Sequence, residues 1–233
     1  MARTLVIVFG AALLAASTAR AAEPARSGIE IGLRTGYAFA AGNRGATPTQ
    51  ADQPVGDFVA GQVPLWLDVG YRLNSDFYMG AFFQYGFGIV NDDRQDVCRL
   101  DNVDCSASDV RVGVMGRYHL PMVSQLSPWL GFGVGYEWGT FSLSLQQPVL
   151  GINGGDATWS GFEFANLQVG ADYHVAPKVA LAPFVSVSFG QFRSVSTTTT
   201  NQMTMTSMTT DEDVTNTSVH EWILIGVRAA FMP

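Results

Sequence analysis

Three histidines are the residues of this sequence that most often take part in catalysis. His119 and His174 lie at the ends of alternating apolar and polar runs, and His220 lies near Ser218 and beside Glu221. A hydrolytic site needs a nucleophile, a base and a group that orients the base, and no spacing here singles out such a set. We therefore expect no catalytic residue, no bound cofactor and no enzyme activity. The histidines are interpreted as polar residues at the ends of structural elements.

Two cysteines and a group of aspartates could bind a metal ion. Cys98 and Cys105 lie seven residues apart in a polar segment, and no histidine lies nearby in the sequence to complete a zinc site. The aspartates do not have the spacing of an EF-hand, so we expect a solvated acidic loop rather than a Ca²⁺ site, and no metal. A disulfide is the other interpretation of the cysteine pair, and it requires an oxidising compartment. The aspartates are Asp92, Asp93, Asp96, Asp101 and Asp104.

Residues 1–21 have the layout of a secretory signal peptide. Arg3 gives a positive start, an apolar run follows, and Ala19-Arg20-Ala21 has the A-x-A form of a cleavage site. The apolar run is shorter than the roughly 20 residues that a transmembrane helix needs. A buried N-terminal helix is disfavoured because Pro24 would break it. We therefore predict that residues 1–21 are removed on export, that residues 22–233 form one domain, and that the two cysteines form a disulfide.

Alternation of apolar and polar residues recurs throughout the predicted domain. Apolar side chains at every second position predict β-strands with one apolar face. A change of phase between Phe164 and Leu167 predicts a β-bulge, and we expect local irregularity at Pro64 and Pro183, which lack a backbone N–H donor. The alternation predicts eight strands, whose apolar faces run over residues 29–39, 65–73, 77–89, 110–120, 130–138, 167–173, 179–189 and 223–231.

The links between these segments are alternately short and long. The short ones are 74–76, about 121–127 and 176–177, and the long ones are about 41–57, 91–108, 143–158 and 194–218. This rhythm is typical of outer-membrane β-barrels, which have tight periplasmic turns and long external loops. It also predicts that both termini are periplasmic. We expect the last long link, which is rich in threonine and methionine, to be a mobile low-complexity loop.

The residues opposite the apolar faces distinguish a membrane barrel from a soluble one. A lipocalin-like barrel has charges outside and an apolar interior. Here the polar face consists of glycines and mixed charges, which suit a narrow interior, whereas the apolar face carries many large aromatic residues, which suit lipid and its interfaces. A closed barrel also leaves no unpaired strand edge in hydrocarbon. The sequence therefore predicts an all-β, eight-stranded, antiparallel, up-and-down transmembrane β-barrel.

The charges predicted to face inward nearly balance, although the chain has a net charge of −7, or −9 without residues 1–21. A balanced interior favours a self-paired plug, because unpaired buried charges would be costly. We expect Glu30 to pair with Arg228 across the seam between the first and last strands, and Arg34 to pair with Asp68. A gated or narrow pore is the alternative. The inward charges are Arg34, Arg72, Arg111, Arg117, Arg228, Glu30, Asp68, Glu137 and Asp172.

The signal peptide, the eight segments and the rhythm of their links resemble the small outer-membrane barrels of the OmpA, OmpX and OmpW type. The last segment resembles the C-terminal signal read by the barrel-assembly machinery, with Gly226 followed five residues later by Phe231. Ala229 is small where a bulky residue is usual, and Met232-Pro233 follow the aromatic residue. The resemblance implies a Gram-negative outer membrane and contact with its lipid and lipopolysaccharide.

These patterns favour an outer-membrane barrel of structural or surface-interaction type, whose external loops are its working surface. A small porin-like channel for ions or hydrophobic solutes is one alternative. A barrel enzyme that modifies lipid A is another, because some eight-stranded barrels do so with a histidine. The acidic chain argues against nucleic acid as a partner, and we expect a monomer.

Overall fold

The computed structural model describes residues 27–91, 96–120, 126–149, 152–201 and 206–233. Residues 1–21, the predicted signal peptide, and Asp92 and Asp93 lie outside this part of the chain. The described residues form one antiparallel sheet and two short 3-10 helices, η1 (Val55–Asp57) and η2 (Asp96–Arg99). The strands are β1 (Gly28–Gly42), β2 (Val59–Arg72), β3 (Phe77–Val90), β4 (Val103–His119), β5 (Leu126–Val149), β6 (Ile152–Ala176), β7 (Val179–Asn201), β8 (Thr206–Asp213) and β9 (His220–Phe231).

Eight of these strands close into a ring. Each strand from β1 to β7 pairs with the next, β7 also pairs with β9, and β9 pairs with β1. β8 stands outside the ring and pairs only with the last residues of β7, Ser194–Asn201. The predicted eight-stranded antiparallel up-and-down barrel is therefore confirmed.

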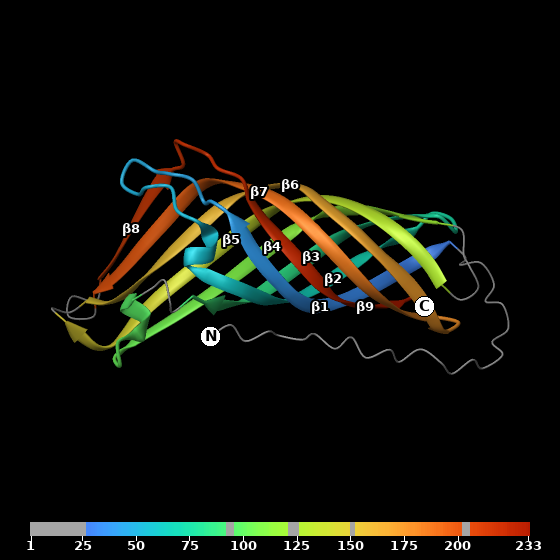
Figure 1. Cartoon of the computed structure of the whole chain (residues 1–233), viewed down its shortest axis with the longest axis horizontal. Coiled ribbons are helices and arrows are strands. Elements are labelled where there is room, and N and C mark those ends of the chain that lie inside the picture. Colours follow the sequence, from blue (N-terminus) through green and yellow to red (C-terminus); the bar gives the residue numbers. More distant parts are fainter. Residues whose placement is uncertain (1–26, 92–95, 121–125, 150–151, 202–205) are drawn as a thin grey trace, which may run out of the picture.

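The two ends of the barrel differ (Figure 1). At one end, which we call the termini end, β1 begins, β9 finishes, and the links are short: four residues join β2 to β3 and two join β6 to β7. The opposite end, which we call the loop end, carries η1, η2, β8 and the long hairpin of β5 and β6. The segment between β1 and β2 packs there against β8, where Thr49 Oγ1 donates to Glu212 at 2.7–2.8 Å.

Two of the predicted long loops are mostly strand. β5 and β6 continue through residues 143–158, and β7 and β8 form a hairpin within residues 194–218. Residues 194–201 and 206–213 are mostly threonine, serine and acidic residues, and they lack the apolar alternation from which the other strands were predicted. Threonine is nevertheless a good strand former, and pairing such as that of Thr197 with Thr210 satisfies backbone groups without an apolar face.

The predicted bulge is confirmed, and so is the predicted local irregularity at the prolines. The register of β6 shifts between Glu163 and Ala165 against β7, and against β5 at the same place. The pairing of β1 with β2 is interrupted at Pro64, and the pairing of β6 with β7 is interrupted at Pro183. On their other sides, Pro64 and Pro183 are paired with Gly86 and Val227. Each proline removes one donor, but neighbouring pairs on both sides hold the register.

The outer surface of the ring carries a continuous belt of exposed apolar side chains. On β2, for example, Leu65, Leu67 and Val69 are 43–48% exposed, and every strand of the ring contributes similar residues. Soluble proteins rarely expose such large apolar surfaces, so this belt is suited to lipid. Among the described residues, no helix has both the length and the apolar character needed to cross a bilayer.

The interior of the ring is packed with side chains. Glycines make room for them: a Cβ added at Gly32 would lie 2.5 Å from Asp68 Oδ1, and one at Gly170 would lie 2.4 Å from Trp129 Cζ2. This agrees with the expectation that the glycine-rich face lines a narrow lumen.

Candidate functional site

A network of buried charges fills the lumen nearest the termini end. We call it the termini-end network; every member is at most 2% exposed. Arg34 Nε lies 2.8 Å from Asp68 Oδ1, and Arg117 Nη2 lies 2.8 Å from Glu30 Oε1 and 3.1 Å from Asp68 Oδ2. Its members are Glu30, Arg34, Asp68, Arg72, Arg117, His119, Asp172 and Arg228.

The seam between β1 and β9 is bridged by the pair predicted from the sequence. Arg228 Nη2 donates to Glu30 Oε1, while Arg228 Nη1 lies 3.3 Å from Asp172 Oδ1. Arg72 donates to the other oxygen of Glu30 at 2.6 Å. One acid on the first strand thus ties together arginines from β2, β4 and β9.

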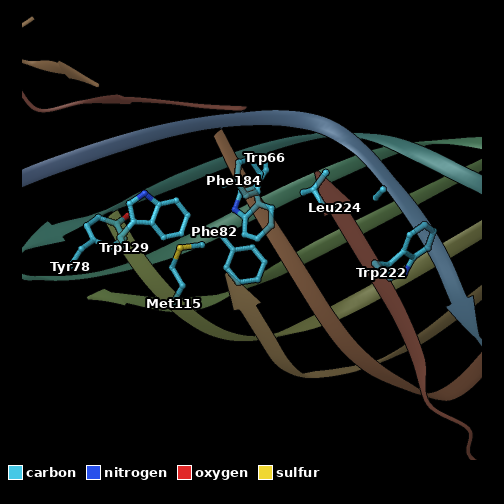
Figure 2. Close-up of a cluster of buried hydrophobic side chains, with 9 residues drawn as sticks. Trp66, Tyr78, Phe82, Met115, Trp129, Phe184, Trp222 and Leu224 are labelled. Atoms are coloured by element: carbon cyan, nitrogen blue, oxygen red, sulfur yellow. The ribbon is translucent and has the colours of Figure 1, made fainter. Parts of the chain in front are cut away.

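A layer of aromatic side chains covers this network toward the loop end (Figure 2). Trp66, Phe82, Met115 and Phe184 pack together across the lumen, and Trp129 lies beside Tyr78. The guanidinium carbon of Arg34 lies 4.6 Å from the centroid of the Trp66 ring. Arginines of the network therefore also bind the faces of the aromatic rings.

A second buried network lies beyond the aromatic layer, and we call it the loop-end network. Arg111 is its only arginine among the described residues, and it contacts three acids: Asp109 at 2.8 Å, Glu137 at 3.2 Å and Glu163 at 3.5 Å. His220 Nε2 lies 3.0 Å from Glu137 Oε2. The structure therefore separates Glu137 and Arg111 from the other predicted lumen charges.

A chain of amide side chains links the two networks along one wall of the lumen. Arg34 Nη1 donates to Gln168 at 2.6 Å, Gln168 donates to Asn166 at 2.9 Å, and Asn166 donates to Glu163 at 2.7 Å. All of these side chains are buried. The polar groups of the lumen are thus bonded to one another from the termini end to the loop-end network.

Two of the three histidines lie at strand ends, as expected, since His119 is the last residue of β4 and His220 the first of β9, but both are buried members of these networks. His119 and His220 are each 1% exposed; His119 Nε2 lies 3.3 Å from Asp172, and the ring of His220 stacks on Phe192 with centroids 4.1 Å apart. Their side chains face the lumen and not the rim, because each continues the inward parity of its strand. His174 is half-buried.

Sequence reasoning missed two acids of the loop-end network. Asp109 has the parity of Arg111, two positions along β4, so extending that strand toward its start would have found it. Glu163 lies at the bulge of β6, where the apolar and polar alternation changes phase. The alternation therefore does not show whether its side chain faces the lumen or the outside.

The cysteine pair joins η2, which contains Cys98, to the start of β4, which contains Cys105. Cys98 and Cys105 form a disulfide, as predicted. Among the described residues, no group of three or more His, Cys, Asp or Glu side chains is arranged to hold a metal ion.

The residues of the predicted assembly signal lie at the closing seam. Gly226 faces Gly36 of β1, and a Cβ added at Gly226 would lie 2.2 Å from the carbonyl oxygen of Thr35. Phe231 is paired with Ile31 and Val179 and is 44% exposed, so it belongs to the outer apolar belt.

The segment between β1 and β2 is held over the loop end by Asp52. Asn43 Nδ2 and Ser218 Oγ donate to Asp52 Oδ2 at 3.0 and 2.9 Å, and the backbone N–H of Gly45 donates to Oδ1 at 2.9 Å. Burial by itself would raise the pKa of Asp52, but these hydrogen bonds outweigh it and lower the pKa below its ordinary value.

Comparison with known proteins agrees with this architecture. The family model described as outer membrane protein beta-barrel domain matches residues 8–220. A search of curated proteins finds no match.

Solved structures match over most of the chain at low identity. The chain is similar to a major outer membrane protein from Thermus thermophilus, with a TM-score of 0.62, 10% identity, and coverage of 88% of this chain and 98% of that one. It is also similar to OprG from Pseudomonas aeruginosa, with a TM-score of 0.47, 16% identity and coverage of 89% and 98%. Neisserial surface protein A gives a TM-score of 0.49, 12% identity and coverage of 89% and 99%.

Proposed function

Because the chain belongs to the outer membrane protein β-barrel domain family, we propose that it is a non-conducting outer-membrane barrel that acts through its loop end. The observation that carries this proposal is the filled lumen. Five buried arginines and six buried acids are bonded to one another inside the ring: Arg34, Arg72, Arg111, Arg117, Arg228, Glu30, Asp68, Asp109, Glu137, Glu163 and Asp172.

The size of the ring supports this. An eight-stranded barrel is only wide enough for its side chains to fill. Trp66 and Trp129, each at most 1% exposed, also occupy the lumen, where the guanidinium carbon of Arg34 lies 4.6 Å and 5.8 Å from the centroids of their rings. A solute would have to displace charge pairs and tryptophans together.

Because the lumen is filled and the outer belt is suited to lipid, the loop end is the part of the molecule that can contact external partners. The short links of the termini end fit the periplasmic side, and the long hairpins and the disulfide segment of the loop end fit the outside of the cell. In this proposal, the protein is a monomer inserted by the barrel-assembly machinery, with both termini periplasmic. Its belt contacts lipid and its loop end meets lipopolysaccharide and external partners.

Conductance in planar lipid bilayers tests the proposal. We expect the wild-type protein to give no steady channel openings. The double variant Trp66→Ala/Trp129→Ala, which empties the aromatic layer, should conduct, whereas Phe77→Ala on the outer belt should behave as wild type. Large, steady wild-type currents would favour the porin-like alternative instead. A change in the mass of lipid A on expression would favour the enzyme alternative.

A further inference from the structure

A cavity of about 90 Å³ lies within the barrel, beyond the loop-end network. Its walls are largely aromatic and come from five different parts of the chain. The wall residues are Phe58, Phe141, Trp159, Phe192 and Trp222. Trp159 and Phe192 are buried against each other with ring centroids 6.1 Å apart, whereas Phe58 and Phe141 are only half-buried.

The floor of the cavity presents hydrogen-bond acceptors that lack partners. Asp109 and Gln62 line the cavity and are 4% and 1% exposed, yet Asp109 Oδ1 and Gln62 Oε1 have no hydrogen-bond partner among the described residues. The other atoms of both side chains are engaged, because Gln62 Nε2 donates to Asp109 Oδ2 at 3.0 Å, and Arg111 Nε lies 2.8 Å from that same oxygen. An unpaired buried acceptor is costly, so this floor is suited to a donor from outside the chain.

The charge near the floor is negative. Asp109, Glu137 and Glu163 face one arginine, Arg111, and His220 can offset one further acid only when it is protonated. A carboxylate or phosphate ligand would be repelled there. A purely apolar ligand would leave both acceptors unpaired.

The aromatic walls already bind one cation of the chain itself. The guanidinium carbon of Arg44, on the cavity lining, lies 4.3 Å from the centroid of Phe58 and 4.4 Å from that of Trp159. This shows that the rings present their faces to positive charge. Since Arg44 occupies these two rings, a second cation would be drawn to the acidic floor.

We propose that this cavity binds a small organic ammonium ion. Its N–H groups donate to Asp109 Oδ1 and Gln62 Oε1, and its apolar part packs against Phe141, Phe192 and Trp222. If each non-hydrogen atom takes the roughly 10–15 Å³ that one water-sized sphere needs, about 90 Å³ holds roughly six to nine atoms. A monocyclic aromatic amine is of this size. The inference rests on the proposed function only in that the ligand arrives from the loop end.

Benzylamine is a suitable probe, because it has a single ring and one ammonium group. We would titrate it by calorimetry into the full-length mature protein in detergent micelles, alongside its neutral analogue benzyl alcohol and the anion benzoate. The proposal expects benzylamine to bind at least tenfold more tightly than benzyl alcohol, and benzoate to show no binding. Equal affinities for the three compounds would overturn it.

Two variants locate the site. Asp109→Asn should reduce the affinity for benzylamine to about that of benzyl alcohol, whereas Asp156→Asn, which removes an exposed carboxylate on β6, should leave it unchanged. Phe141→Leu replaces a half-buried aromatic wall residue with a smaller one. It should weaken the binding of benzylamine and of benzyl alcohol several-fold and leave the preference for benzylamine over benzyl alcohol unchanged. The last variant keeps the test decisive if Asp109→Asn does not fold. An unchanged preference in folded Asp109→Asn, or unchanged affinities in Phe141→Leu, would contradict the assignment.

Failure of this inference and failure of the proposed function give different results. A conducting wild-type barrel that still prefers benzylamine would overturn only the non-conducting role. A non-conducting wild-type barrel that binds benzylamine, benzyl alcohol and benzoate with equal affinity would overturn only the ammonium site.

Discussion

Arg34 and Arg228 are direct cross-strand neighbours at the seam where β1 meets β9, and both side chains are buried in the lumen. Like charges at facing positions normally destabilise a sheet. Here the nearest acid to Arg34 is Asp68 at 2.8 Å and the nearest acid to Arg228 is Glu30, while Asp68 also lies 3.5 Å from Arg228 Nη2. The closure of the barrel therefore depends on acids supplied by the first two strands.

The first prediction concerns Arg228→Ala. Removing this guanidinium takes one partner from Glu30 and another from Asp172, both of which remain buried. Breaking a buried pair in this way costs about 3–5 kcal/mol of the free energy of unfolding. Urea unfolding of the protein in lipid vesicles, followed by the mobility difference between heated and unheated samples, would measure it. Arg193→Ala, on an exposed position of β7, is the control and should change little. If Arg228→Ala lowered the free energy of unfolding by less than about 1 kcal/mol, the pair of Arg228 and Glu30 would not be needed to stabilise the seam.

The sequence was sufficient to predict the ring and the lumen charges nearest the termini end. Parity along each strand places Glu30, Arg34 and Asp68 on one face, and a narrow closed barrel brings facing residues of neighbouring strands together. Arg34 can then reach Asp68 diagonally, because β1 and β2 are neighbours with Gly32 opposite Asp68 and Arg34 opposite Trp66.

Other features depend on distances that parity does not give. The division into two networks arises because Trp66, Phe82 and Phe184 lie at one height, and that height depends on the stagger of strands far apart in the chain. The cavity likewise requires Phe58, Trp159 and Trp222 to meet across the barrel. The long strands at the loop end were missed because threonine-rich segments lack the apolar alternation from which the other strands were recognised.

The second prediction concerns the glycines of the lumen. A Cβ on residue 170 would lie 2.4 Å from Trp129, whose Nε1 donates to Asp172 at 3.0 Å, so the tryptophan has little freedom to move. We expect Gly170→Ala to destabilise the barrel by about 1–3 kcal/mol through overpacking. Gly28→Ala is the matched control, because nothing lies within 4 Å of its added Cβ. Equal urea midpoints for the two variants would show that the lumen has room for a methyl group beside Trp129.

The third prediction concerns the disulfide between Cys98 and Cys105. Protein that has passed through the periplasm should contain no free thiols, and both cysteines should react with an alkylating reagent only after reduction. Closing so short a loop contributes about 2–3 kcal/mol at most on the chain-entropy estimate. The bridge ties η2 to the third residue of β4, while pairing with β5 holds that strand along the rest of its length, so reduction should loosen the segment between β3 and β4 and leave the heat-dependent mobility shift unchanged. Loss of that shift on reduction would show that the bridge holds the barrel itself.

The last prediction concerns Asp52 and the pH at which the segment between β1 and β2 loosens. Hydrogen bonds from Asn43, Ser218 and the N–H of Gly45 lower the pKa of Asp52 in the folded protein, despite the opposite effect of burial. A group with a depressed folded pKa stabilises the fold above its unfolded pKa, about 3.9 for aspartate, and that contribution is lost as the pH falls through the folded pKa. The segment should therefore stay ordered from pH 7 to 5 and loosen only below about pH 4.

Nuclear magnetic resonance can follow this directly through the amide of Gly45, whose hydrogen bond to Asp52 should titrate below the ordinary aspartate range. In Asp52→Asn the side chain cannot carry the charge, so we expect faster amide exchange at Gly45 at every pH and no titration. Arg44, which precedes Gly45 and donates to Gln53 at 2.5 Å, should then shift from its place over Phe58 and Trp159. A Gly45 amide that titrates at or above pH 4 in the wild-type protein would contradict the proposed balance between burial and hydrogen bonding.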